Sequence, residues 1–285
     1  SAIIGPIIPP SNIMIIYAGC VGTVSVGKMF LAGAIPGILL GIAYMIFCYW
    51  ISVKRKYPCR KTRATWKEIG HATWETLPAL LLPIIIMGTI TLGICTATES
   101  SAIAVIYSTI VAACKKNLSI KSFCRACIRS AKAAANVLFI IAISSAMAWA
   151  VTTLGVAQAL TNFCVAYINN KIVFLLFVNV LLLLIGMLLD ASPALLLMVP
   201  ILWPVAKTLG IDAIHFGVMV CFNLMVGTLT PPVGMMLFIV SNVGKVKLSV
   251  MYKGILPFVA VAVVVLLLIT YVPSLTTWLP GVLMP

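Results

Sequence analysis

The sequence predicts an all-α integral membrane protein built from an inverted repeat, with discontinuous helices and a re-entrant hairpin. Three observations support this prediction. Hydrophobic residues make up 63% of the 285 residues and charged residues only 8%, which is more apolar surface than a soluble core of this size buries. Two long apolar stretches are each interrupted by a pair of adjacent prolines. The basic residues fall in short segments between apolar runs.

The net charge of +14 is also typical of nucleic-acid-binding proteins, which gather their basic residues on one face of a polar domain. Here most of them form two clusters between apolar runs, which indicates cytoplasmic loops and no nucleic-acid partner. The first cluster is Lys54, Arg55, Lys56, Arg60, Lys61, Arg63 and Lys67, and the second is Lys115, Lys116, Lys121, Arg125, Arg129 and Lys132.

The N-terminal part of the sequence is expected to comprise the end of one repeat, followed by a loop. Residues 1–52 are expected to contain a broken helix and the span that follows it, because residues 29–52 are long enough to cross a bilayer once. Residues 53–76 form the first basic loop. Its end is expected to be a helix lying flat on the membrane, because apolar residues recur there on one helical face: Trp66, Ile69, Trp74 and Leu77.

Residues 77–285 are expected to form the second repeat, running in the opposite direction. Both basic clusters lie on one side of the membrane only if the first helical pair makes a complete round trip. The predicted elements are the helical pair 77–114, a span at 133–154, a re-entrant hairpin at 172–206, a broken helix at 216–243 and a last span at 254–275.

The hairpin is predicted from its turn and from its length. Asp190 is followed by Ser192 and Pro193, which suit the N-cap and the first position of a new helix. Residues 194–206 would extend only about 20 Å, which is too short to cross a bilayer. We therefore expect the turn to lie deep in the protein.

The two double-proline segments are copies of one motif. Pro10 precedes Gly33 by 23 residues, and Pro232 precedes Gly254 by 22. In both copies a further proline follows the glycine after three residues. The distribution of charges gives the copies opposite directions, and inverted repeats with discontinuous helices are typical of secondary transporters.

The chemistry of the breaks follows from proline, which has no N–H to bond the carbonyl four residues earlier. Pro9 is expected to free the carbonyl of Gly5, and Pro231 that of Gly227. Free carbonyls at membrane depth need a partner, and a sodium ion is the natural candidate. The alternative is that the prolines only kink helices that pack against their neighbours.

Helix N-termini at the breaks offer a second kind of site. Half-helices beginning near Ser11 and Val233 would present N–H groups to the oxygens of an anionic substrate. Asp190 is a candidate for binding the ion or the substrate, with capping of the following helix as the alternative. Thr96 and Glu99 are expected to form a capping box, a structural role.

Other classes of protein find little support. A two-aspartate intramembrane protease needs a second buried aspartate, and no cluster of His, Cys and Ser with a supporting base is present, so no enzyme is expected. His71 and His215 are isolated and suggest no metal site, and no cofactor is expected apart from a coupling ion. The main alternative is a proton-coupled or channel-like organic anion transporter that uses Asp190.

Four segments resemble the large membrane subunit of tripartite ATP-independent periplasmic (TRAP) transporters. They are "GPIIPPSNIMIIYAG…SVGKMFLAGAIPGILL", "GICTATESSAIAVIYS", "IGMLLDASPALLLMVPILWPVAKTLGIDAIHFGVM" and "LMVGTLTPPVGMMLFIVSN". The resemblance covers nearly the whole chain. It departs from the family at the "TPTE" motif, which reads "TATE" here because Ala97 replaces a proline.

The resemblance implies an elevator-type carrier in the bacterial inner membrane that imports organic acids, such as C4-dicarboxylates or sialic acid, with the sodium gradient. It implies two partners, a small membrane subunit and an extracytoplasmic solute-binding protein. The family's large subunit has a first half before the first double-proline segment, and this sequence is expected to be the C-terminal portion.

The resemblance also implies two sodium sites. The first would use Gly5, Ile8 and Pro10 together with residues of the preceding half. The second would use Gly186, Gly227, Thr230 and Val233. The proline argument independently supports Gly5 and Gly227, and the hydroxyl of Thr230 adds an oxygen, whereas the other positions rest on the resemblance.

Overall fold

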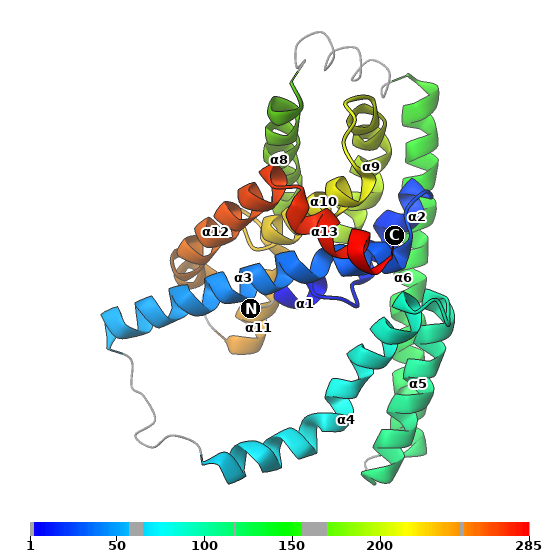
Figure 1. Cartoon of the computed structure of the whole chain (residues 1–285), viewed down its shortest axis with the longest axis vertical. Helices are drawn as coiled ribbons and strands as arrows, with labels where there is room; N and C mark the ends of the chain where they lie inside the picture. Colours follow the sequence, from blue (N-terminus) through cyan, green and yellow to red (C-terminus); the bar gives the residue numbers. More distant parts are fainter. Residues whose placement is uncertain (1–2, 57–64, 117, 156–169, 246–247, 285) are drawn as a thin grey trace. The chain divides into compact units, whose positions relative to one another are not determined.

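The computed structural model describes residues 3–56, 65–116, 118–155, 170–245 and 248–284, and all regular elements in these ranges are helices (Figure 1). The predicted all-α fold is therefore confirmed. Arg60, Lys61 and Arg63 of the first basic cluster lie outside the described residues. The helices are α1 (Ile4–Ile7), α2 (Asn12–Val21), α3 (Val26–Arg55), α4 (Trp66–Thr91), α5 (Ala97–Cys114), α6 (Ile120–Thr153), α8 (Lys171–Leu188), α9 (Ala191–Thr208), α10 (Ala213–Gly227), α11 (Met235–Gly244), α12 (Leu248–Tyr271) and α13 (Ser274–Leu283).

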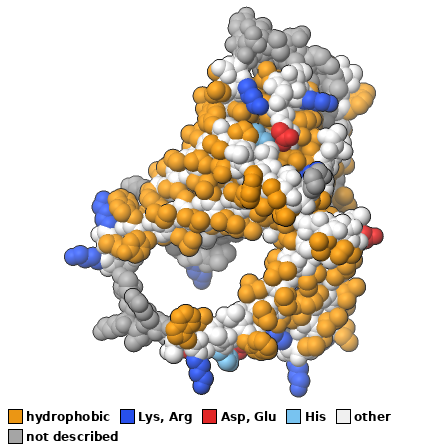
Figure 2. All heavy atoms as spheres, viewed as in Figure 1, with side chains coloured by type: hydrophobic (Ala, Val, Ile, Leu, Met, Phe, Trp, Pro, Cys, Tyr) orange, Lys and Arg blue, Asp and Glu red, His pale blue; other side chains and the backbone are white. Residues whose placement is uncertain are grey.

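Eight helical segments of the described chain are long and apolar enough to cross a membrane. Their outer faces carry large apolar side chains, such as Met45, which is 66% exposed, and Phe139, which is 68% exposed. Hydrophobic side chains cover much of the visible face of the molecule in Figure 2. Apolar surfaces of this extent are suited to contact with lipid or with another membrane protein.

The chain divides into two compact units. Unit 1 comprises Ser1–Phe47 and Leu138–Pro285, and unit 2 comprises Cys48–Val137. This division differs from the expected domains, because the helical pair 77–114 falls in the same unit as the basic loop. The first broken helix instead joins the second one in unit 1, since α1 and α2 both contact α10.

The core of unit 1 is built around α10. Every residue from His215 to Gly227 is buried, and the helix contacts α2, α8, α9, α12 and α13. A helix that is apolar on all sides is stable only when other elements surround it. Because α10 ends at the second double-proline break, Gly227 lies in this core and Thr230 is half-buried just beyond it.

Helices α8 and α9 form a helical hairpin, with a turn at Leu189 and Asp190. The expectation that its second arm is too short to cross a bilayer is wrong, because α9 starts at Ala191 and has 18 residues. Whether the hairpin re-enters the membrane stays a prediction. The N-cap of α9 is Asp190, whose Oδ1 accepts a hydrogen bond from the N–H of Ala191 at 2.8 Å. Ser192, which the sequence suggested as the N-cap, lies inside the first turn instead. Pro193 is tolerated there because the first amide groups of a helix lack intrahelical carbonyl partners.

Unit 2 contains α4, α5 and the beginning of α6. The expected surface helix is not separate from the span that follows it, because α4 runs without interruption from Trp66 to Thr91 and includes Pro78 and Pro83. Two polar contacts join α4 to α5. The Tyr107 hydroxyl donates to the Pro78 carbonyl at 2.8 Å, and the Thr89 and Ser100 hydroxyls lie 2.8 Å apart. A proline removes one helical hydrogen bond, and α4, which packs against α5, continues through both prolines.

Candidate functional site

The second double-proline segment breaks the chain between α10 and α11, as the sequence predicts. The Gly227 carbonyl, however, accepts a hydrogen bond from the Thr230 N–H at 2.9 Å. The expectation that Pro231 leaves this carbonyl bare is therefore wrong, because the last turn of α10 tightens to an i to i+3 bond. A carbonyl oxygen has two lone pairs, so one remains for another partner.

Thr230 presents its side-chain oxygen at the same break. Its hydroxyl donates to the Val226 carbonyl at 2.9 Å. A hydroxyl group that donates one hydrogen bond still has lone pairs that can accept a cation. Thr230 is half-buried, and its N–H and its hydroxyl both bond carbonyls of the last turn of α10.

The hairpin meets this break through two glycines. A Cβ atom added to Gly227 would lie 2.7 Å from the Gly186 Cα, and one added to Gly186 would lie 3.0 Å from the Gly227 Cα. The backbones of α8 and α10 therefore touch. The Gly234 N–H also donates to the Met187 carbonyl at 3.3 Å, so the hairpin holds both sides of the break.

The first double-proline segment separates the short helix α1 from α2. The Ile8 N–H donates to the Ile4 carbonyl at 2.8 Å, and Pro9 has no N–H, so helix α1 supplies no donor to the Gly5 carbonyl. Gly5, Ile8 and Pro10 are all exposed. Both Pro–Pro peptide bonds, Pro9–Pro10 and Pro231–Pro232, are cis.

The half-helices after the two breaks begin differently. Ser11 is the N-cap of α2, and its Oγ accepts from the Met14 N–H at 3.4 Å and donates to the Pro6 carbonyl. Ser11 is 1% exposed, so the structure gives its hydroxyl a capping role. In the second copy α11 begins only at Met235, two residues after Val233, because the N-cap is Gly234 with a φ of 59°. This left-handed conformation favours glycine.

The repeat is also asymmetric in its packing. A Cβ on Gly33 would lie 3.0 Å from the Ile7 carbonyl oxygen, whereas one on the corresponding Gly254 would meet nothing within 4 Å. In the second copy the Tyr252 hydroxyl instead donates to the Pro232 carbonyl at 2.8 Å. The first copy thus holds its break by close backbone packing, and the second copy uses a hydrogen bond from α12.

Two acidic residues that the sequence singled out serve as caps. Asp190 is exposed at the turn of the hairpin, where it caps α9. At the start of α5 the Thr96 N–H donates to the Glu99 carboxylate at 2.8 Å, and the Glu99 N–H donates to the Thr96 hydroxyl at 3.3 Å. This arrangement is the capping box that the sequence predicts, and it forms even though Ala97 replaces the family's proline.

Sequence reasoning did not identify a buried chain of polar side chains in unit 1. The Asn223 Nδ2 group donates to the backbone and side-chain oxygens of Asn179 at 2.9 and 2.7 Å, and the Asn179 Nδ2 group donates to the Thr270 hydroxyl at 3.0 Å. His215 is the last member of this series of hydrogen bonds: its Nε2 atom bonds the Thr270 carbonyl at 3.2 Å, and its Nδ1 atom bonds the Thr276 hydroxyl at 3.0 Å. Because a carbonyl only accepts, His215 Nε2 carries the proton. The sequence signal for these hydrogen bonds is the presence of Asn179 and Asn223 within apolar runs.

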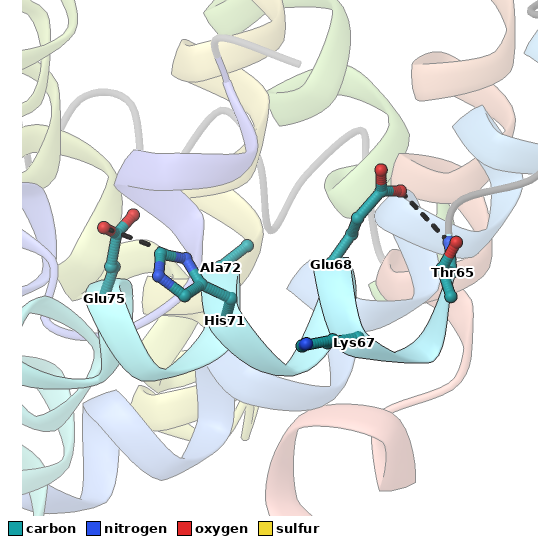
Figure 3. A pocket seen from close by; sticks show the side chains of 6 residues that line it. All are labelled: Thr65, Lys67, Glu68, His71, Ala72 and Glu75. Atoms are coloured by element: carbon teal, nitrogen blue, oxygen red, sulfur yellow. Dashed lines mark hydrogen bonds and ion pairs between the residues drawn. The ribbon is translucent and has the colours of Figure 1, made fainter.

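Unit 2 carries surface pockets of its own, which are lined by residues other than those of the two breaks. Figure 3 shows the residues at the start of α4 that line one such pocket, with His71 and Glu75 side by side. The pocket has a volume of about 510 Å³, and the His71 Nδ1 atom lies 3.8 Å from a Glu75 carboxylate oxygen. Both side chains are largely exposed. The described residues contain no cluster of three or more His, Cys, Asp or Glu side chains that could hold a metal.

A helix that is broken at a proline pair and packs backbone to backbone against a helical hairpin is an arrangement typical of α-helical membrane proteins with discontinuous helices. The chain belongs to the DctM component family of tripartite ATP-independent periplasmic transporters, whose family description matches residues 1–275. It is thus a multi-pass protein of the bacterial inner membrane.

Three relatives illustrate the similarity. The chain is 38% identical over 286 residues to the sialic acid TRAP transporter permease protein SiaT of Haemophilus influenzae, covering 100% of this chain and 46% of SiaT. It is 35% identical over 279 residues to the C4-dicarboxylate TRAP transporter large permease protein DctM of Pseudomonas aeruginosa, covering 98% of this chain and 65% of DctM. It is 38% identical over 285 residues to the uncharacterized protein YgiK of Salmonella typhimurium, covering 100% of this chain and 65% of YgiK. The chain therefore spans less than two thirds of the length of each.

Proposed function

We propose that the complete transporter containing this chain imports small organic anions by coupling their movement to sodium. The observation that carries this proposal is the backbone contact between Gly186 of the hairpin and Gly227 at the end of the broken helix, close to the Thr230 hydroxyl in the following turn. Transporters of inverted-repeat architecture bind coupling ions with such oxygens. Sodium is then the only non-protein component required for coupling, and no resident cofactor takes part.

The second sodium site would use oxygens of Gly186, Gly227, Thr230 and Val233. Its support is strongest for Gly227, whose carbonyl lies at a helix end and keeps one lone pair for an ion. Val233 immediately precedes Gly234, which is bonded to the hairpin. The carbonyls from this break and from the hairpin can therefore converge on one ion.

The first sodium site would use Gly5, Ile8 and Pro10 together with residues of the complete transporter outside this chain. This site is supported by the Gly5 carbonyl, to which helix α1 supplies no hydrogen-bond donor. The three residues are exposed in unit 1, so a further segment has room to complete the coordination.

The substrate class is a small organic anion. Relatives carry names that specify sialic acid, C4-dicarboxylate, isethionate and 2,3-diketo-L-gulonate, and all of these compounds carry a negative charge at neutral pH. Sodium bound at the break would offset that charge, and helix N-termini would offer N–H groups to its oxygens. Asp190 and Ser192 lie at the N-terminus of α9 and are candidates for contact with the ion or the substrate.

The mechanism is inferred to be of the elevator type. Both broken helices and the hairpin belong to unit 1, so the whole ion-binding region can move as one body. A small membrane subunit and an extracytoplasmic solute-binding protein that delivers the cargo are the proposed partners. Large apolar faces on α5 and α6 would be covered by lipid or by the membrane subunit.

A proton-coupled or channel-like anion transporter is the second candidate, because the Asp190 carboxylate is exposed at the hairpin turn. Uptake of a labelled substrate by the complete transporter in proteoliposomes separates the two. Replacing sodium with choline at a fixed pH gradient is expected to abolish uptake if sodium is the coupling ion. Undiminished uptake in choline would instead favour coupling through Asp190. The named functions of relatives are transport functions, which supports a carrier over an enzyme.

A further inference from the structure

The buried contact between Asn179 and Asn223 lies close to the proposed second sodium site. Asn223 precedes Gly227 by one helical turn, which corresponds to a rise of about 6 Å along α10. Asn179 precedes Gly186 by seven residues, or about 10 Å along α8. Helices α8 and α10 therefore touch at two levels, first through the amide pair and then through the two glycines.

The amide contact fixes the position of α8 on α10 more closely than an apolar contact would. The amide contact precedes the glycine contact along both helices, so α8 and α10 run in the same direction at this interface. Apolar contacts between helices are compatible with more than one register, whereas a buried amide pair is satisfied at only one. The Asn223 Nδ2 group donates to two oxygens of the same residue, at 2.9 and 2.7 Å, which fixes both the height and the rotation of α8.

The amide pair is also bonded to the helix that supports the far side of the break. Asn179 Nδ2 donates to the Thr270 hydroxyl of α12 at 3.0 Å. Near the other end of α12, the Tyr252 hydroxyl donates to the Pro232 carbonyl at 2.8 Å. The same helix thus contacts the amide pair and the proline break.

The Oδ1 atom of Asn223 indicates that the amide pair does more than stabilise the fold. Asn223 is fully buried, and within the described part of the chain its Oδ1 atom has no hydrogen-bond partner. A buried polar atom without a partner costs free energy, and replacing both amides of such a pair by apolar side chains of similar size is often neutral or stabilising. The retained amide therefore points to a requirement for position.

We propose that Asn179 and Asn223 are positioning residues for the second sodium site: their buried contact sets the register of α8 on α10 and so brings the Gly186 and Gly227 carbonyls to one ion. The inference rests on the proposed sodium coupling. Neither amide needs to touch the ion itself.

The test uses the complete transporter with Asn223→Leu and Asn223→Ser, both of which remove the Nδ2 donor. Thr276→Val is the matched control. It removes a hydrogen bond from the same buried chain, but at His215, which lies about 18 Å from Gly227 along α10. Sodium half-saturation of uptake, substrate half-saturation at saturating sodium and the sodium-induced shift in melting temperature are measured for each.

We expect Asn223→Leu and Asn223→Ser to raise the sodium half-saturation at least fivefold and to reduce the sodium-induced melting shift. Substrate half-saturation at saturating sodium should stay within twofold, and Thr276→Val should resemble the wild type in both sodium measurements. If the Asn223 variants fold and keep a wild-type sodium half-saturation, this inference is wrong and the proposed sodium coupling still stands. Failure of both variants to fold would assign the pair to folding and overturn it as well. Wild-type uptake that needs no sodium would overturn the proposed function together with this inference.

Discussion

The contact between Gly186 and Gly227 makes a specific prediction about Gly227→Ala. The added Cβ would lie 2.7 Å from the Gly186 Cα and 2.9 Å from its carbonyl carbon, whereas carbon atoms pack at about 3.5–4.0 Å. Helices α8 and α10 must therefore separate by about 1 Å. Overpacking of this kind costs about 1–3 kcal/mol, because backbone atoms cannot rotate away as a flexible side chain can.

The separation should also be visible in sodium binding. Each 1.4 kcal/mol corresponds to a tenfold change in an equilibrium constant, so strain of about 1–3 kcal/mol that falls on the ion site would raise the sodium half-saturation by about fivefold to 100-fold. Thermal unfolding and sodium titration of uptake by the complete transporter measure the two effects. Gly186→Ala, which places a Cβ 3.0 Å from the Gly227 Cα, should act in the same direction.

Gly41→Ala is the matched control. Gly41 lies inside α3, and a Cβ there would meet nothing within 4 Å. Alanine in a helix interior is favoured over glycine by roughly 0.5–1 kcal/mol, so this variant should be neutral or slightly stabilising. If Gly227→Ala matched Gly41→Ala in both melting temperature and sodium half-saturation, the close approach of α8 and α10 would play no part in the site, and the reasoning would be refuted.

Three further predictions follow from individual side chains. Thr230→Ala should raise the sodium half-saturation in uptake assays without loss of folding, and Thr230→Ser should restore it; an unchanged value would exclude the hydroxyl as a ligand. Asp190→Asn should change the free energy of unfolding by less than about 0.5 kcal/mol, because asparagine caps helices as well as aspartate, and sodium-driven uptake should persist. Loss of pH-gradient-driven uptake in that variant would instead support proton coupling. Glu99→Ala should lower the melting temperature through loss of the capping box, whereas Glu99→Gln, whose side chain can still accept from the Thr96 N–H, should lower it much less; equal melting temperatures for the two would contradict the capping role.

The features that depend on local chemistry were predictable from the sequence. Proline cannot donate a backbone hydrogen bond, so both breaks, at Pro9 and at Pro231, could be placed to within a few residues. The helical hairpin and the capping box at Thr96 followed from local signals for turns and caps. The long apolar runs gave the fold class.

Features that depend on partners distant in sequence were not predictable. The Thr230 N–H bonds the Gly227 carbonyl because the turn tightens, and nothing in the residue types distinguishes this from an open break. Helix α4 continues through Pro78 and packs against α5, with a hydrogen bond from the Tyr107 hydroxyl, 29 residues away, to the Pro78 carbonyl. His215 looked isolated, although its ring bonds residues 55 and 61 positions away.

The central claim is that oxygens of the second break and the hairpin hold a sodium ion. A high-resolution electron cryomicroscopy map of the complete transporter, recorded in sodium and again in choline, tests it most directly. The account predicts a density feature within coordination distance of the Gly227 carbonyl and the Thr230 hydroxyl in sodium that disappears in choline. Identical maps in the two salts at this position, from a protein whose uptake requires sodium, would contradict it.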